Sequence, residues 1–169
     1  MIKHRPELPH PPKEIIDEVY KALEKRKNIN AYSGEDPYFL YEYMDATDTM
    51  IQWCKDNIDK HVDWAVQYFV GTIPAHSDWV FDDHKLNYLV ELGGGSPETY
   101  WFDADGNVIY TAVCEIGWYE LTVNVPHSVS NVTGNRISIT HRSRRDTLAD
   151  RAGLKRDEKD AVKDYGFKP

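Results

Sequence analysis

The residues best suited to chemistry in this sequence are two histidine–aspartate pairs with the same spacing. His76 and Asp78 stand in the stretch IPAHSDW, and His61 and Asp63 stand in KHVDW. On a β-strand, residues two positions apart point to the same face, so each pair could aim an imidazole and a carboxylate at one point. Both groups are common metal ligands. The spacing therefore predicts a metal-binding pair without choosing between the two stretches.

A third ligand for the first pair is His127, in the stretch NVPHSV. Two histidines and one carboxylate arranged facially leave three positions on a metal open, which suits Fe(II) in oxygen chemistry. The alternative is that these are ordinary core or surface residues in a chain that has 7 histidines. His61 and Asp63 have no obvious third ligand and are interpreted as surface residues.

Arg136 and Ser138, in the stretch GNRISIT, offer a second kind of chemistry. On a strand they share one face with Thr140, while Ile137 and Ile139 share the other. A guanidinium and a hydroxyl on one face can hold a carboxylate by charge-assisted hydrogen bonds. The opposite arrangement, with the isoleucines inward and the arginine on the outer face, also satisfies the alternation.

Two N-terminal helices and a set of strands must position these residues. Apolar residues recur at helical spacing from residue 13 to about Asn28, and again within residues 45–60, where Asp45 or Asp48 is the expected cap. Beyond these helices the period changes to that of strands, and the turn residues DADGN between two β-prone runs predict a hairpin.

Six to eight antiparallel strands, joined in part by the loop HSVSNVTG, predict a mainly β fold with flanking N-terminal helices, a barrel or jelly roll. A chain of 169 residues suits one domain. We expect an N-terminal helical segment at residues 1–62 that packs on the core, a β core at residues 63–142, and a polar C-terminal tail or short helix at residues 143–169.

Charge and cysteine content narrow the class of protein. The net charge of −8 makes a nucleic-acid partner unlikely, and the short basic cluster at residues 141–145 is interpreted as a solvated edge. Two cysteines, Cys54 and Cys114, make no disulfide framework. The N-terminus does not have the pattern of a signal peptide, and no apolar run approaches the ~20 residues of a membrane span. We expect an intracellular, cytoplasmic protein with no membrane partner.

The chain from about Tyr68 to His141 resembles the 2-oxoglutarate/Fe(II)-dependent oxygenases, especially small prolyl-hydroxylase-like and other compact members. The resemblance is carried by three ordered stretches: YFVGTIPAHSD, KLNYLVELGGGSPET with its Gly-Gly segment, and HSVSNVTGNRIS, in which Arg136 lies nine positions after His127. One departure concerns Arg136, because prolyl hydroxylases usually carry lysine at that position.

The resemblance implies a double-stranded β-helix (a jelly roll of cupin-like form) and a defined set of roles. His76, Asp78 and His127 match the Fe(II) ligands. Arg136 and Ser138 match the residues that bind the distal carboxylate of 2-oxoglutarate, and Tyr68 matches a tyrosine that often contacts this co-substrate. The implied reaction consumes O2, releases succinate and CO2, and hydroxylates a C–H bond of a small molecule or protein side chain.

Two other functions remain open at the level of the sequence. One is an Fe(II) oxidase that uses the same triad without 2-oxoglutarate, with Arg136 and Ser138 holding a substrate carboxylate. The other is a non-catalytic metal-binding β-barrel module. Asn87 and Tyr88 alternate on a predicted strand, so only one of them can face the interior, and either is a candidate contact for the co-substrate. The sequence does not indicate the substrate or the oligomeric state.

Overall fold

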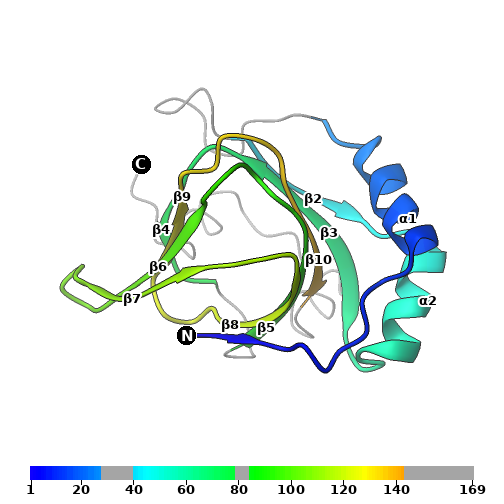
Figure 1. Cartoon of the computed structure of the whole chain (residues 1–169), viewed down its shortest axis with the longest axis horizontal. Coiled ribbons are helices and arrows are strands. Elements are labelled where there is room, and N and C mark those ends of the chain that lie inside the picture. Colours follow the sequence, from blue (N-terminus) through cyan, green and yellow to red (C-terminus); the bar gives the residue numbers. More distant parts are fainter. Residues whose placement is uncertain (28–39, 79–83, 143–169) are drawn as a thin grey trace, which may run out of the picture.

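The β-strands form two antiparallel sheets, and two helices lie on the outside of the larger sheet (Figure 1). This arrangement is seen in a computed structural model that describes residues 1–27, 40–78 and 84–142. The polar tail or short helix predicted at residues 143–169 lies outside the described residues.

The helices form where the apolar spacing predicts them, but they are shorter. Helix α1 spans Lys13–Leu23 rather than continuing to about Asn28, and buries Ile15, Val19, Ala22 and Leu23. Helix α2 spans Asp48–Asn57, and the side chain of Thr47, rather than that of an aspartate, accepts a hydrogen bond from the Met50 N–H at 3.3 Å. No helix among the described residues has the length and apolar character needed to cross a membrane.

The larger sheet has six strands, and both the first and the last described strands of the chain belong to it. The order is β1 (Ile2–His4), β8 (Gly117–Thr122), β5 (His84–Leu92), β10 (Arg136–Arg142), β3 (Asp63–Val70) and β2 (Leu40–Asp45). Strands β1 and β2 come from residues 1–62, predicted as an N-terminal helical segment, so this segment also supplies both edges of the sheet.

The smaller sheet has four strands, in the order β4 (Ile73–His76), β9 (His127–Ser130), β6 (Glu98–Phe102) and β7 (Val108–Val113). From β3 to β10 the chain alternates between the sheets, except for the β6–β7 hairpin, and the two sheets wrap around a common interior (Figure 1). This is the strand order of a jelly roll, so the predicted double-stranded β-helix is confirmed. Strand β9 corrects the sequence-based prediction of a loop at residues 127–134.

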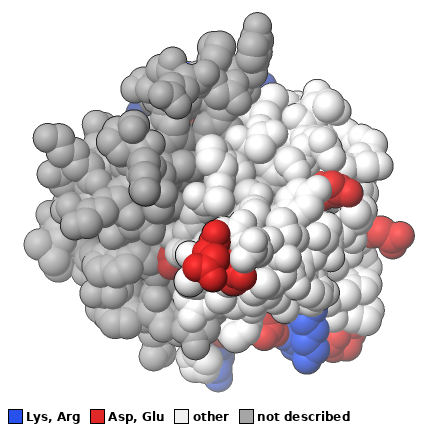
Figure 2. Space-filling model, turned by 90° about the vertical axis from the view of Figure 1, so that its left-hand side faces the viewer, with Lys and Arg blue, Asp and Glu red and all other residues white. Residues whose placement is uncertain are grey.

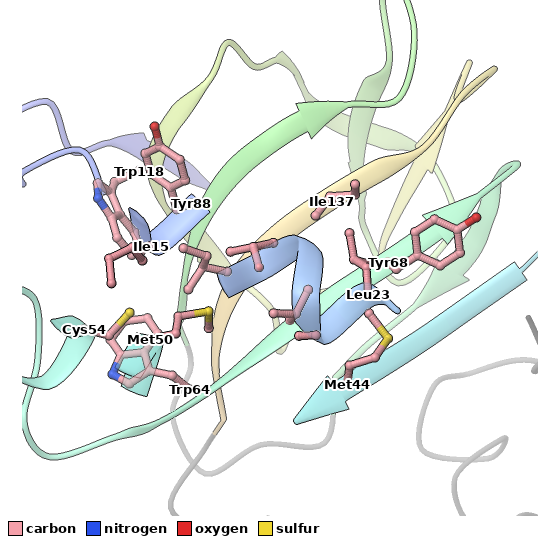
Figure 3. Close-up of a cluster of buried hydrophobic side chains, with 14 residues drawn as sticks. Ile15, Leu23, Met44, Met50, Cys54, Trp64, Tyr68, Tyr88, Trp118 and Ile137 are labelled. Atoms are coloured by element: carbon pink, nitrogen blue, oxygen red, sulfur yellow. The ribbon is translucent and has the colours of Figure 1, made fainter. Parts of the chain in front are cut away.

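The main hydrophobic core lies between the helices and the outer face of the larger sheet (Figure 3). Ile137 and Ile139 of β10 are buried there together with Trp64, Tyr88 and other apolar residues. Burying each large apolar side chain contributes roughly 1.5–3 kcal/mol. Because the helices cover this face, β10 can bury its isoleucines and still present Arg136 to the other side of the sheet.

The β6–β7 hairpin forms at the turn predicted from DADGN. Both Asp105 and Asn107 donate their backbone N–H to Asp103 Oδ1, at 2.9 and 2.8 Å, and Gly106 adopts a positive φ of 86°. Figure 2 views the side of the molecule from which this hairpin projects. The described part of this face is mostly uncharged, with acidic side chains near its centre and basic ones only near its edges (Figure 2).

Candidate metal centre

The pairing of β4 with β9 places two histidines side by side. His76, the last residue of β4, is directly opposite His127, the first residue of β9. Their ring centroids are 4.4 Å apart, and both side chains are largely buried, with His76 9% and His127 7% exposed. Two residues that are far apart in the sequence thus become neighbours through one antiparallel ladder.

The same local hydrogen bond orients both rings. Nδ1 of His76 lies 2.8 Å from the carbonyl oxygen of Pro74, and Nδ1 of His127 lies 2.8 Å from that of Val125. A carbonyl oxygen only accepts, so Nδ1 carries the proton in both rings. The Nε2 atom of each ring is therefore the atom that can face a metal, and such a bond at the other nitrogen is typical of metal-binding histidines.

Asp78 completes the cluster just beyond the end of β4. Its backbone N–H donates to the Val123 carbonyl at 2.8 Å, and its Oδ1 lies 3.4 Å from Nε2 of His76. One potential ligand atom from each of Asp78, His76 and His127 lies within 4.8 Å of the others. Two donors about 2.1 Å from one ion and at right angles are about 3 Å apart, so small side-chain movements would bring this set onto a metal.

The second histidine–aspartate pair does not form such a cluster. His61 is exposed, and Asp63 lies 3.9 Å from Lys55 in a partly exposed ion pair. Within residues 1–27, 40–78 and 84–142, the only group of three potential ligands is His76, Asp78 and His127. The structure therefore favours the stretch IPAHSDW over KHVDW.

The electrostatics of the cluster suit a cation. Burial by itself would raise the pKa of Asp78, but the positive charge of Lys85 and the hydrogen bond and charge of His76 together hold this pKa well below its usual range. Burial, with the neighbouring His76, lowers the pKa of His127 to about 4. Near pH 7 the cluster thus presents a carboxylate and a neutral His127 imidazole, the forms that bind metals.

Arg136 and Ser138 of β10 line the same cavity as the three potential ligands. The Arg136 guanidinium, 7% exposed, donates from Nη1 to the Leu92 carbonyl at 2.9 Å and lies over the Phe69 ring. The Ser138 hydroxyl donates to Gln67 Oε1 at 3.1 Å. The alternation predicted for β10 is confirmed, with the arginine on the cavity side and the isoleucines against the helices.

Tyr68 is not brought together with these residues. It lies on the helix-covered face of β3, where its hydroxyl donates to Asn135 Oδ1 at 3.3 Å and Arg26 lies over its ring. Its neighbours Gln67 and Phe69 line the cavity instead. The same alternation on β5 places Asn87 in the cavity and Tyr88 in the core, as expected of residues that alternate.

The cavity also contains polar residues that were not predicted from the sequence, among them Lys85, Tyr43 and Cys114. Lys85 shares the period-two face of β5 with Asn87, and this pattern was the available signal for it. Lys85 Nζ donates to the Tyr43 hydroxyl at 2.8 Å and lies 3.6 Å from Asp78 Oδ2. Cys114 neighbours the Arg136 guanidinium, and burial raises the pKa of its thiol although the arginine lowers it.

The fold and the cluster together define a jelly-roll protein with a candidate His-Asp-His metal centre. No protein-family model matches the sequence, and no curated protein matches it. Solved structures are similar at low identity. A prolyl-4-hydroxylase from Pseudomonas putida is 15% identical, with a TM-score of 0.49 over 85% of this chain and 92% of that one.

Two further structures cover less of their own length. Fe(II)-HppE with an alternative substrate is 15% identical, with a TM-score of 0.42 over 70% of this chain and 56% of that chain. The Mn(II)-containing oxalate decarboxylase from Bacillus subtilis is 14% identical, with a TM-score of 0.40 over 85% of this chain and 38% of that chain. The chain thus spans about half of the first protein and less of the second. At this level of similarity the strand order, rather than any match, carries the fold assignment.

Proposed function

We propose that this chain is an Fe(II)- and 2-oxoglutarate-dependent oxygenase that hydroxylates a C–H bond and releases succinate and CO2. The observation that carries the proposal is that one cavity holds both a buried His-Asp-His cluster and a buried arginine with a serine two residues on. The first set supplies ligands for Fe(II). The second supplies donors for a carboxylate.

The residues of this chain have separate tasks in such a reaction. His76 and His127 offer Nε2 and Asp78 offers a carboxylate oxygen, each held by a backbone hydrogen bond. Arg136 and Ser138 hold the distal carboxylate of 2-oxoglutarate, whose negative charge offsets the buried guanidinium. Apolar side chains of the cavity wall limit the access of water. Fe(II), when bound, supplies the activation of O2 and the oxidation of the C–H bond.

We infer that the substrate is a small molecule or an exposed protein side chain. A nucleic acid is not expected, because the net charge is −8 and the described part of the face in Figure 2 is mostly uncharged and offers no basic groove. An intracellular, cytoplasmic location remains an expectation from the sequence.

The test is anaerobic binding of Fe(II) and 2-oxoglutarate, followed by the charge-transfer absorption band of the ternary complex. We expect the wild-type protein to show this band and His76→Ala and Asp78→Ala to lose it. His61→Ala is the matched control, because it removes an exposed histidine with the same spacing to an aspartate. If the band is absent from the wild type, or is intact in both cluster variants, the proposal is wrong.

A second measurement separates this function from that of an oxidase that does not use 2-oxoglutarate. Turnover of 2-oxoglutarate, coupled or uncoupled, yields succinate in proportion to the O2 consumed. If O2 consumption with a true substrate requires Fe(II) but forms no succinate, the oxidase alternative replaces the oxygenase.

A further inference from the structure

Lys85 is a buried cation beside the candidate metal centre. It is the second residue of β5 and is 9% exposed. A buried ammonium is costly unless it is paired and hydrogen-bonded. Its Nζ lies 2.8 Å from the Tyr43 hydroxyl, 5.1 Å from the centre of the Tyr43 ring and 3.6 Å from Asp78 Oδ2. These contacts place the charge at one defined point in the cavity.

The two oxygens of Asp78 face different neighbours. Oδ1 lies 3.4 Å from Nε2 of His76, a potential metal ligand, whereas Oδ2 lies 3.6 Å from Nζ of Lys85. The backbone N–H of Asp78 is fixed by the Val123 carbonyl at 2.8 Å. A carboxylate anchored at its backbone and at one oxygen has little freedom to turn about its side-chain bonds.

We propose that Lys85 is a positioning residue that holds Oδ2 of Asp78 away from the metal, so that the aspartate offers Oδ1 alone. The proposal rests on the metal site of the proposed function but not on the use of 2-oxoglutarate. Carboxylates bind metals through either one or two oxygens. A carboxylate bound through both would take one of the three positions that a facial triad leaves open for other ligands.

Tyr43 fixes the position of Lys85. It lies on β2, and the two strands β10 and β3 lie between β2 and β5 in the larger sheet. Lys85 therefore reaches across the inner face of the sheet to the Tyr43 hydroxyl. Removing the hydroxyl leaves the ammonium charge in the cavity but takes away one of the contacts that direct it. Tyr43→Phe should therefore act in the same direction as loss of the lysine, but more weakly.

The experiment counts the water molecules on bound Mn²⁺ by electron–nuclear double resonance in water enriched in ¹⁷O, with the full chain and no co-substrate. We expect about three in the wild type and about two in Lys85→Met, because Oδ2 then joins the ion. Lys85→Arg restores a cation and should restore the wild-type number. Tyr43→Phe keeps the lysine and serves as the second variant if Lys85→Met does not fold.

Each outcome bears on the proposal. If Lys85 acted only through its charge, Lys85→Met would change the affinity for Mn²⁺ but leave the number of bound water molecules the same. That result would overturn the proposal that Lys85 positions Asp78. So would an unchanged number in both Lys85→Met and Tyr43→Phe. Failure of the wild type to bind Mn²⁺ removes the metal site itself and the proposed function with it. A wild type that binds Mn²⁺ with the expected pattern but never binds 2-oxoglutarate leaves the role of Lys85 standing.

Discussion

Replacing Gly93 by alanine should disturb both the stability of the protein and the position of Arg136. Gly93 follows β5 and has a positive φ of 87°. Its carbonyl accepts the N–H groups of Thr133 at 2.8 Å and Gly134 at 3.1 Å, so it holds the loop that leads into β10. A Cβ at this position would lie 2.7 Å from Cγ1 of Val132 and 2.9 Å from Cβ of Arg136.

The size of the effect follows from two costs. The left-handed conformation costs a non-glycine residue about 1–2 kcal/mol. Forcing a methyl group into a packed contact costs about 1–3 kcal/mol more. The sum is about 2–5 kcal/mol of unfolding free energy, and a protein of this size loses about 2–4 °C of Tm per kcal/mol. We therefore expect Gly93→Ala to lower the Tm by roughly 4–20 °C.

Gly95→Ala is the matched control, two residues further along the same segment. Nothing lies within 4 Å of the Cβ that it would add, and its φ is not in the left-handed region. Its unfolding free energy should change by no more than about 0.5 kcal/mol. Calorimetry or urea unfolding of both variants measures the difference. Equal Tm values for Gly93→Ala and Gly95→Ala would refute the argument that this loop is closed by direct contact with the glycine.

Three further predictions concern the site and one helix. The pKa of His127 is about 4 in the folded protein and 6.5 in the reference state, so the unfolded chain takes up a proton at a higher pH than the folded protein does. The free energy of unfolding of the metal-free protein should therefore fall by about 3 kcal/mol as the pH falls from 6.5 to about 4. In urea unfolding measured across this pH range, His127→Gln should weaken the dependence of the unfolding free energy on pH. Arg136→Gln should raise the Kd for 2-oxoglutarate at least about tenfold in calorimetric titration, with Arg136→Lys in between, because charge-assisted hydrogen bonds contribute about 1.5–3 kcal/mol; equal Kd values would remove the arginine from the co-substrate site. Thr47→Ala should cost about 1 kcal/mol by loss of the N-cap of α2, and Thr47→Ser should recover most of it in the same unfolding assay.

The sequence predicted those parts of the fold that have a strong local pattern. The apolar stripe of α1, the DADGN hairpin and the alternation in β10 each depend on residues close together in the chain. Strand β9 has only four residues, of which three are buried, so no alternation marked it as a strand. Strand β2 is an edge strand that pairs only with β3 among the described strands, and its position depends on that distant partner.

The candidate site was likewise predictable only where residue type and local spacing identified its members. His76, Asp78 and His127 could be named from ligand types and spacing, because β4 and β9 each present a histidine at a strand end. Alternation alone could not decide between Tyr68 and Gln67, since β3 is buried on both faces and nothing in its sequence tells the helix side from the cavity side. Lys85 was missed because its partners Tyr43 and Asp78 come from separate elements.

The two buried faces of β10 make this strand unusually sensitive to the number of residues before it. A single inserted or deleted residue in the loop at residues 131–135 would exchange the faces, placing Arg136 in the apolar core and Ile137 in the cavity. An unpaired buried charge costs several kcal/mol, so such a chain would scarcely fold. Point substitutions in the cavity change only one side chain and leave the core intact. We therefore expect related chains to change the chemistry of this strand by substitution, and to change in length in other loops.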